Sequence, residues 1–131
     1  MSQGIIPKDG FGLQSAEWLT GLINGVNYTY ANGISAAGST QATATQLPGN
    51  TALVEIDTVG ASQGVALPGA YAGTDFCIYN NTATTLTVYP QITNNLVTGV
   101  QDTINNTTST TINAHVGGYF FCGKNGNWCS K

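Results

Sequence analysis

The chain has 131 residues and a mass of 13.5 kDa, which suits one domain that buries roughly two-thirds of its unfolded surface. Only 7% of the residues are charged, against about 25% in an ordinary soluble protein, and there is one histidine, His115. Three basic residues argue against nucleic-acid binding, which needs a basic cluster. The shortage of His, Cys and carboxylates argues against catalysis, so we expect no enzyme, no metal and no cofactor.

Residues 1–45 are predicted to form an N-terminal arm. Its first 14 residues carry apolar side chains without a period and are interrupted by glycines, which is typical of an extended segment buried on a partner. A short helix is expected near 15–25, because Ser15 suits an N-cap, Gly25 suits an end, and Trp18 and Leu22 share one face. The residues expected to grip the partner are Ile5, Ile6, Phe11, Leu13 and Trp18.

The chain contains no run of 18 or more apolar residues, and its first residues lack the basic-then-apolar order of a signal peptide. We therefore expect a protein that folds in a cytoplasm and does not bind a membrane. Disulfides are rare in that compartment.

Residues 46–131 read as one β-domain. Residues 28–47 are rich in Ala, Gly, Ser and Thr, and are either a thin edge strand or an extended crossing segment. In residues 51–59, Val54 and Ile56 alternate with Glu55 and Asp57, as a half-buried strand requires. Further strands are predicted at 64–69, 75–80, 84–89, 103–105, 110–114 and 118–122, with a last one ending at 129. The pattern predicts an all-β fold, an antiparallel, jelly-roll-like β-sandwich or β-barrel.

A hairpin is predicted at the C-terminus, where Asn125-Gly126 is flanked by strand residues. A two-residue turn there pairs Lys124 with Asn127 and Cys122 with Cys129, with the two cysteine Cα atoms about 5.5 Å apart. These cysteines are a structural pair, either bridged or, as we favour in a reducing cell, two stacked thiols. Cys77 is expected in the core.

Three chemical alternatives were weighed. His115 with Ser109 or Cys122, oriented by Asp102, lacks a nucleophile elbow or oxyanion turn, so a turn histidine is favoured. Glu55 and Asp57 share one sheet face, but an outer face does not separate the pKa values of a catalytic pair. The many tyrosines, asparagines and threonines leave open a surface that binds carbohydrate.

Residues 38–131 carry an ordered set of short motifs. The motifs are Gly38-Ser39-Thr40-Gln41-Ala42-Thr43-Ala44-Thr45-Gln46-Leu47, Val65-Ala66-Leu67-Pro68, Ala72-Gly73, Asn80-Asn81, Leu86-Thr87-Val88-Tyr89-Pro90, Asp102-Thr103-Ile104-Asn105, Phe121-Cys122 and Trp128. The ordered set resembles a small β-domain of structural proteins in tailed bacteriophages. The departures from that pattern are residues 91–101, which are longer and richer in Asn and Thr, and the added Cys129.

Such domains occur in head decoration (cement) proteins and in tail or fibre proteins, so the resemblance implies a virion protein. The 131 residues contain no coiled coil, triple β-helix or attachment module of a fibre, which favours a capsid decoration protein. The expected partners are the major capsid protein, on the outer surface of its lattice, and further copies of the chain, a trimer in preference to a dimer. The alternative is a tail or fibre domain that binds a host receptor or surface glycan.

Overall fold

The computed structural model describes residues 29–49 and 51–131. These ranges are all-β, as predicted, with ten strands in two sheets and one 3-10 turn, η1 (Gln41–Thr43). The helix expected near 15–25 and the five arm residues lie outside the described residues. No helix in the described ranges is long and apolar enough to span a membrane. The strands are β1 (Tyr30–Ser35), β2 (Thr45–Gln46), β3 (Leu53–Thr58), β4 (Gly64–Ala66), β5 (Asp75–Asn80), β6 (Leu86–Tyr89), β7 (Thr103–Ile104), β8 (Thr110–Ile112), β9 (Gly117–Lys124) and β10 (Asn127–Ser130).

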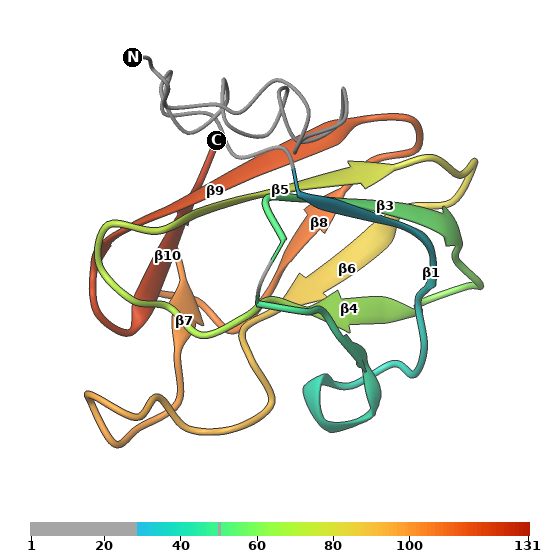
Figure 1. Ribbon diagram of the computed structural model, residues 1–131. Coiled ribbons are helices and arrows are strands. Elements are labelled where there is room, and N and C mark those ends of the chain that lie inside the picture. The colour runs from blue at the N-terminus through green and yellow to red at the C-terminus, as the bar shows by residue number, and fades with distance from the viewer. Residues whose placement is uncertain (1–28, 50) are drawn as a thin grey trace, which may run out of the picture.

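The first six strands form three coils of a β-solenoid (Figure 1). The chain alternates between a six-stranded sheet, ordered β1-β3-β5-β9-β10-β7, and a four-stranded sheet, ordered β2-β4-β6-β8. Within each sheet successive coils pair in parallel. Partners lie from 20 positions apart, as in Thr45 with Val65, to 24, as in Leu53 with Cys77.

The prediction of an antiparallel, jelly-roll-like sandwich or barrel is therefore wrong. Alternation of apolar residues specifies which face of a strand is buried, but not the direction of the neighbouring strand. Each connection from β1 to β6 crosses to the other sheet, as from Thr58 in β3 to Gly64 in β4, so the next strand of the first sheet returns in parallel. The first coil contains β1 and β2, so the described fold begins before the boundary near residue 46 that the sequence predicts.

The last four strands close the stack of coils at its C-terminal end. β8 pairs antiparallel with β6, and β9 pairs antiparallel with β5, so each sheet receives a strand running against the coils. β10 then returns beside β9, and β7 pairs in parallel with β10. Terminal units of a solenoid differ from internal ones because they must cover the end of a continuous core.

The core lies between the two sheets and is built from stacked aliphatic rows. Val54 pairs with Ile78 across β3 and β5, and Val65 pairs with Val88 across β4 and β6; all four side chains are buried. The inward alternation predicted for Val54 and Ile56 is thus confirmed. Cys77, which the sequence placed in the core, instead lies half-buried on the outer face of β5, between the inward-facing Phe76 and Ile78.

The C-terminal hairpin has the predicted turn but a different register. Lys124 pairs with Asn127 as expected, and Gly126 adopts a positive φ of 91°. A register shift follows, so that Cys129 pairs with Phe121 rather than with Cys122. A one-residue slip moves side chains to the other face of a strand, and here it coincides with full burial of Trp128. The predicted opposition of Cys122 and Cys129 is not formed, and all three cysteines are free thiols.

Candidate interaction site

Several of the short motifs that carry the resemblance, those containing Pro68, Gly73, Cys122 and Trp128, meet at one corner of the fold. The Trp128 indole Nε1–H donates to the Pro68 carbonyl at 3.0 Å. Backbone bonds from Gly73 N to the Cys122 carbonyl (2.8 Å) and from Cys122 N to the Thr74 carbonyl (2.9 Å) tie the segment before β5 to β9. These motif residues therefore hold the connection between β4 and β5 against the C-terminal hairpin.

A buried carboxylate lies at the centre of this corner. Asp102 is 1% exposed and accepts hydrogen bonds from three neutral donors: Ala70 N (2.9 Å) and Gln91 Nε2 (2.8 Å) at Oδ2, and Asn95 Nδ2 (2.9 Å) at Oδ1. We refer to Ala70, Gln91, Asn95 and Asp102 as the Asp102 network. Hydrogen bonds to a charged acceptor are shorter and stronger than neutral ones. The sequence indicated Asp102 as the orienting acid of a candidate triad and as the first residue of one motif, and it did not predict burial of this side chain.

The Asp102 network holds the loop of residues 93–101, between β6 and β7. Asn95, also 1% exposed, donates from Nδ2 to the Ala70 carbonyl (2.9 Å) as well as to Asp102. Its Oδ1 accepts from Val97 N (2.8 Å) and Thr98 N (3.1 Å), which closes a tight turn. The backbone adds bonds from Gly99 N to the Asn95 carbonyl and from Asn95 N to the Val100 carbonyl. Asn95 is therefore both the base of the loop and the cap of its turn.

The tip of this loop exposes three aliphatic side chains: Leu96 at 91%, Val97 at 64% and Val100 at 61%. We call these three residues the loop tip. In Figure 1 the loop hangs below the two sheets at the lower left, away from the outer face of the six-stranded sheet. Single exposed apolar residues are ordinary, whereas a cluster on a well-bonded loop is typical of an interaction surface.

A second apolar surface lies on the outer face of the six-stranded sheet. Tyr30, Leu53, Cys77 and Tyr119 are lateral partners across β1, β3, β5 and β9, a span of about 14 Å at the usual strand spacing. Phe121 stacks on Tyr119, with ring centroids 5.7 Å apart. We call these five residues the outer stripe. All but the half-buried Cys77 are exposed.

The acidic side chains on this face have local hydrogen-bond partners. The Tyr119 hydroxyl donates to Asp75 at 3.4 Å, and the Asn81 amide donates to Glu55 at 3.1 Å. Burial raises the pKa of the Cys77 thiol, and the nearby Asp75 carboxylate raises it further. Burial likewise raises the pKa of Cys122. The neutral thiol is therefore the favoured form at both positions.

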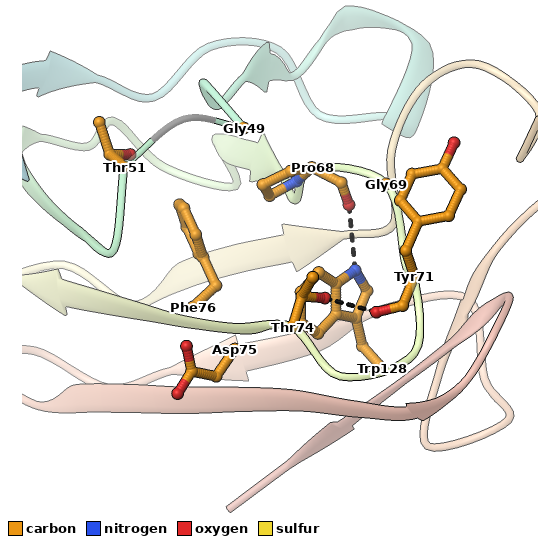
Figure 2. A pocket seen from close by; sticks show the side chains of 9 residues that line it. All are labelled: Gly49, Thr51, Pro68, Gly69, Tyr71, Thr74, Asp75, Phe76 and Trp128. Atoms are coloured by element: carbon orange, nitrogen blue, oxygen red, sulfur yellow. Dashed lines mark hydrogen bonds between the residues drawn. The ribbon is translucent and has the colours of Figure 1, made fainter. Parts of the chain in front are cut away.

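A cavity of about 380 Å³ opens beside the corner, between the two sheets. Figure 2 shows Phe76 and Trp128 rising from the six-stranded sheet toward Pro68, with Thr51 and Tyr71 at opposite ends. The carboxylate of Asp75 points away from Phe76, onto the outer face. The Thr74 hydroxyl donates to the Tyr71 carbonyl at 2.6 Å. The lining is thus aromatic and hydroxylated.

The structure does not assemble the candidate catalytic groups into a recognisable site. His115 is exposed in a turn with φ +57°, where its backbone N–H donates to the Thr82 carbonyl at 3.1 Å, whereas Asp102 is committed to its own network. Within the described ranges, no group of three or more His, Cys, Asp or Glu residues is placed to hold a metal ion.

Sequence reasoning missed the loop tip and the base that holds it. The only signal was the unusual length and Asn/Thr content of residues 91–101, because Leu96 and Val97 have the composition of core residues. Comparison with known proteins adds no further guide: no family model, no curated protein and no solved structure matches this chain.

Proposed function

We propose that the protein is a structural component of a tailed-bacteriophage virion, a decoration protein that assembles with copies of itself on the outer surface of the capsid lattice. The observation that carries this proposal is the outer stripe, a row of uncharged side chains that crosses four strands and is exposed except at the half-buried Cys77. An exposed apolar surface of this kind suits a symmetric association of identical chains.

The charge distribution supports the proposal. Residues 76–101 contain no Asp, Glu, Lys or Arg, and this stretch includes most of β5, all of β6 and the 93–101 loop. Interface cores are depleted in charged residues and enriched in aromatic ones. A chain whose apolar surfaces are covered by neighbours needs few charges to remain dispersed.

The choice of partner in this proposal rests on the resemblance to phage structural domains. Several of its motifs lie in the framework of the fold, at the corner around Pro68, Asp102 and Trp128, as expected of residues that define a domain rather than a reaction. The major capsid protein is the proposed partner and the outer head surface the proposed location. The trimer preferred over the dimer remains a prediction.

The test is to mix the purified protein with expanded heads of the encoding phage that were assembled without it. Saturable binding with hundreds of copies per head supports decoration. About a dozen copies per virion, with none on the head, would assign the protein to the tail and overturn the proposal. Sedimentation of the free protein reports the oligomer.

A second candidate function, a tail domain that binds surface glycan, is favoured by the cavity beside Trp128. Its volume of about 380 Å³ falls within the range of small-ligand sites, and its aromatic, hydroxyl-bearing lining suits a neutral sugar. Retention on host polysaccharide that is lost when Thr51→Phe fills the cavity would favour this function. Equal retention of the Thr51→Phe variant, or no retention at all, would count against it.

A further inference from the structure

The loop tip is a preformed projection rather than a mobile loop. Leu96, Val97 and Val100 project from a turn whose base, Asn95, is buried and makes four side-chain hydrogen bonds. A fifth hydrogen bond ties the loop to the connection between β4 and β5, because Leu96 N donates to the Tyr71 hydroxyl at 3.3 Å. Side chains ordered before binding lose less entropy when they bind, which favours affinity.

The chemistry of the tip narrows its partner. It is convex, aliphatic and uncharged, so its complement is a concave apolar pocket. Insertion into a lipid bilayer usually relies on basic and interfacial aromatic residues, but residues 93–101 contain no Lys, Arg, Trp or Tyr, and the chain has a net charge of −3. A protein pocket therefore fits better than a membrane surface.

The position of the tip separates it from the surface proposed for contacts between copies. The outer stripe lies on the outer face of the six-stranded sheet, and the 93–101 loop extends on the other side of the molecule (Figure 1). Copies joined through the outer stripe leave the loop tip free for a different partner.

We infer that the loop tip is the anchor by which the protein attaches to the capsid shell, with Leu96 inserted into an apolar pocket between or within major capsid subunits. This inference rests on the proposed function and names the contact that performs it. The contact predicted between the N-terminal arm and the capsid is separate from the contact made by the loop tip. On a repeating lattice, several tips carried by one oligomer multiply the affinity of each.

The experiment compares Leu96→Asp with Asn94→Asp in binding to expanded heads. Both variants add one negative charge to exposed positions of the same loop, but only the first changes the apolar tip, and the Asn94 side chain makes a single 3.5 Å hydrogen bond. Loss of a central hydrophobic anchor weakens binding about 100-fold, whereas the Asn94 control should change it less than about threefold. Leu96→Met should retain most of the binding.

The outcomes separate this inference from the proposed function. Binding of wild type with equal binding of Leu96→Asp overturns the anchor and leaves the decoration role standing. Absence of wild-type binding overturns both. Loss of self-association in the Leu96→Asp variant, with head binding retained, assigns the tip to a second copy instead. Cosedimentation with neutral or anionic phosphatidylcholine-based vesicles assigns it to a membrane. Matching thermal unfolding curves for the two Asp variants show that folding is not the cause.

Discussion

The loop tip and the outer stripe both expose apolar side chains, but they are held in different ways. Each residue of the outer stripe is placed by a β-ladder, in which Leu53 has strand neighbours on both sides. The loop tip is placed by one buried carboxylate and one buried amide, Asp102 and Asn95. A surface supported by a ladder distributes its support over many backbone bonds, whereas a surface supported by a side-chain network depends on a few residues.

This difference predicts unequal tolerance to substitution. Removing one side chain from the outer stripe leaves its strand paired, so the change stays local. Removing one member of the Asp102 network leaves several buried donors without an acceptor, which costs far more. Changes at Asp102, Asn95, Tyr119 and Cys77 test that contrast.

Asp102→Ala should lower the free energy of unfolding by about 3–5 kcal/mol, because it strips the acceptor from three buried donors at once. Asp102→Asn keeps one oxygen acceptor and should cost less. Urea denaturation measures both values. A loss below about 1 kcal/mol for Asp102→Ala would contradict the role assigned to the network.

Asn95→Ala should cost about 2–3 kcal/mol and loosen the loop, because it removes the two bonds that hold the base and the two that close the turn. Hydrogen exchange of the Val97 and Thr98 amides should quicken. The matched control is Asn94→Ala, whose exposed amide makes a single 3.5 Å bond and should cost less than about 0.5 kcal/mol. Equal losses at the two positions would mean that the loop is not held by Asn95.

Tyr119→Ala in the outer stripe should cost only about 1 kcal/mol in stability, because it removes the stacking on Phe121 and leaves β9 paired on both sides. Self-association should fall by at least tenfold, since Tyr119 lies on the proposed contact between copies. Analytical ultracentrifugation measures this, with exposed Thr108→Ala as the control. Unchanged association would remove the outer stripe from the interface.

The rate of alkylation of Cys77, a member of the outer stripe, should differ only modestly between the folded and the unfolded protein. Its raised pKa means that the folded protein favours the neutral thiol. At pH 8 iodoacetamide should therefore label Cys77 several-fold more slowly in the folded protein than in urea. Because the pKa of Cys77 is raised in the folded protein, the stability contributed by its neutral thiol is present below the unfolded pKa and is lost as the pH rises through the folded pKa. Above the folded pKa, the difference in labelling rate between the folded protein and the protein in urea should narrow. Peptide mass spectrometry follows the site, and equal rates at pH 8 would contradict the shift.

Much of the fold could be predicted because burial leaves a local pattern. The alternation of Val54 and Ile56 with Glu55 and Asp57 located a strand and its inner face, and Asn125-Gly126 located a turn. The pairing of strands could not be predicted in this way, because parallel and antiparallel neighbours bury the same residues. The hairpin shows the limit clearly: local turn chemistry predicted Cys122 opposite Cys129, whereas the observed register buries Trp128 and pairs Cys129 with Phe121.

The candidate site was the least predictable part. Leu96 and Val97 resemble core residues in sequence, and only the path of the chain between β6 and β7 leaves them exposed. Asp102 resembles a surface or catalytic acid, and only the approach of Ala70 and Asn95 makes it a buried acceptor.

An all-β chain with few charges could be predicted from composition and from strand periodicity, which is a pattern of neighbouring residues. The stacking of the strands as three parallel coils with an antiparallel end is seen only in the tertiary structure. The tertiary structure also decided that a buried carboxylate holds an apolar tip outside the core. Those outcomes depend on contacts between residues up to about 60 positions apart in the sequence, such as the hydrogen bond from Trp128 to Pro68. A local sequence pattern does not report the free energy of such long-range contacts.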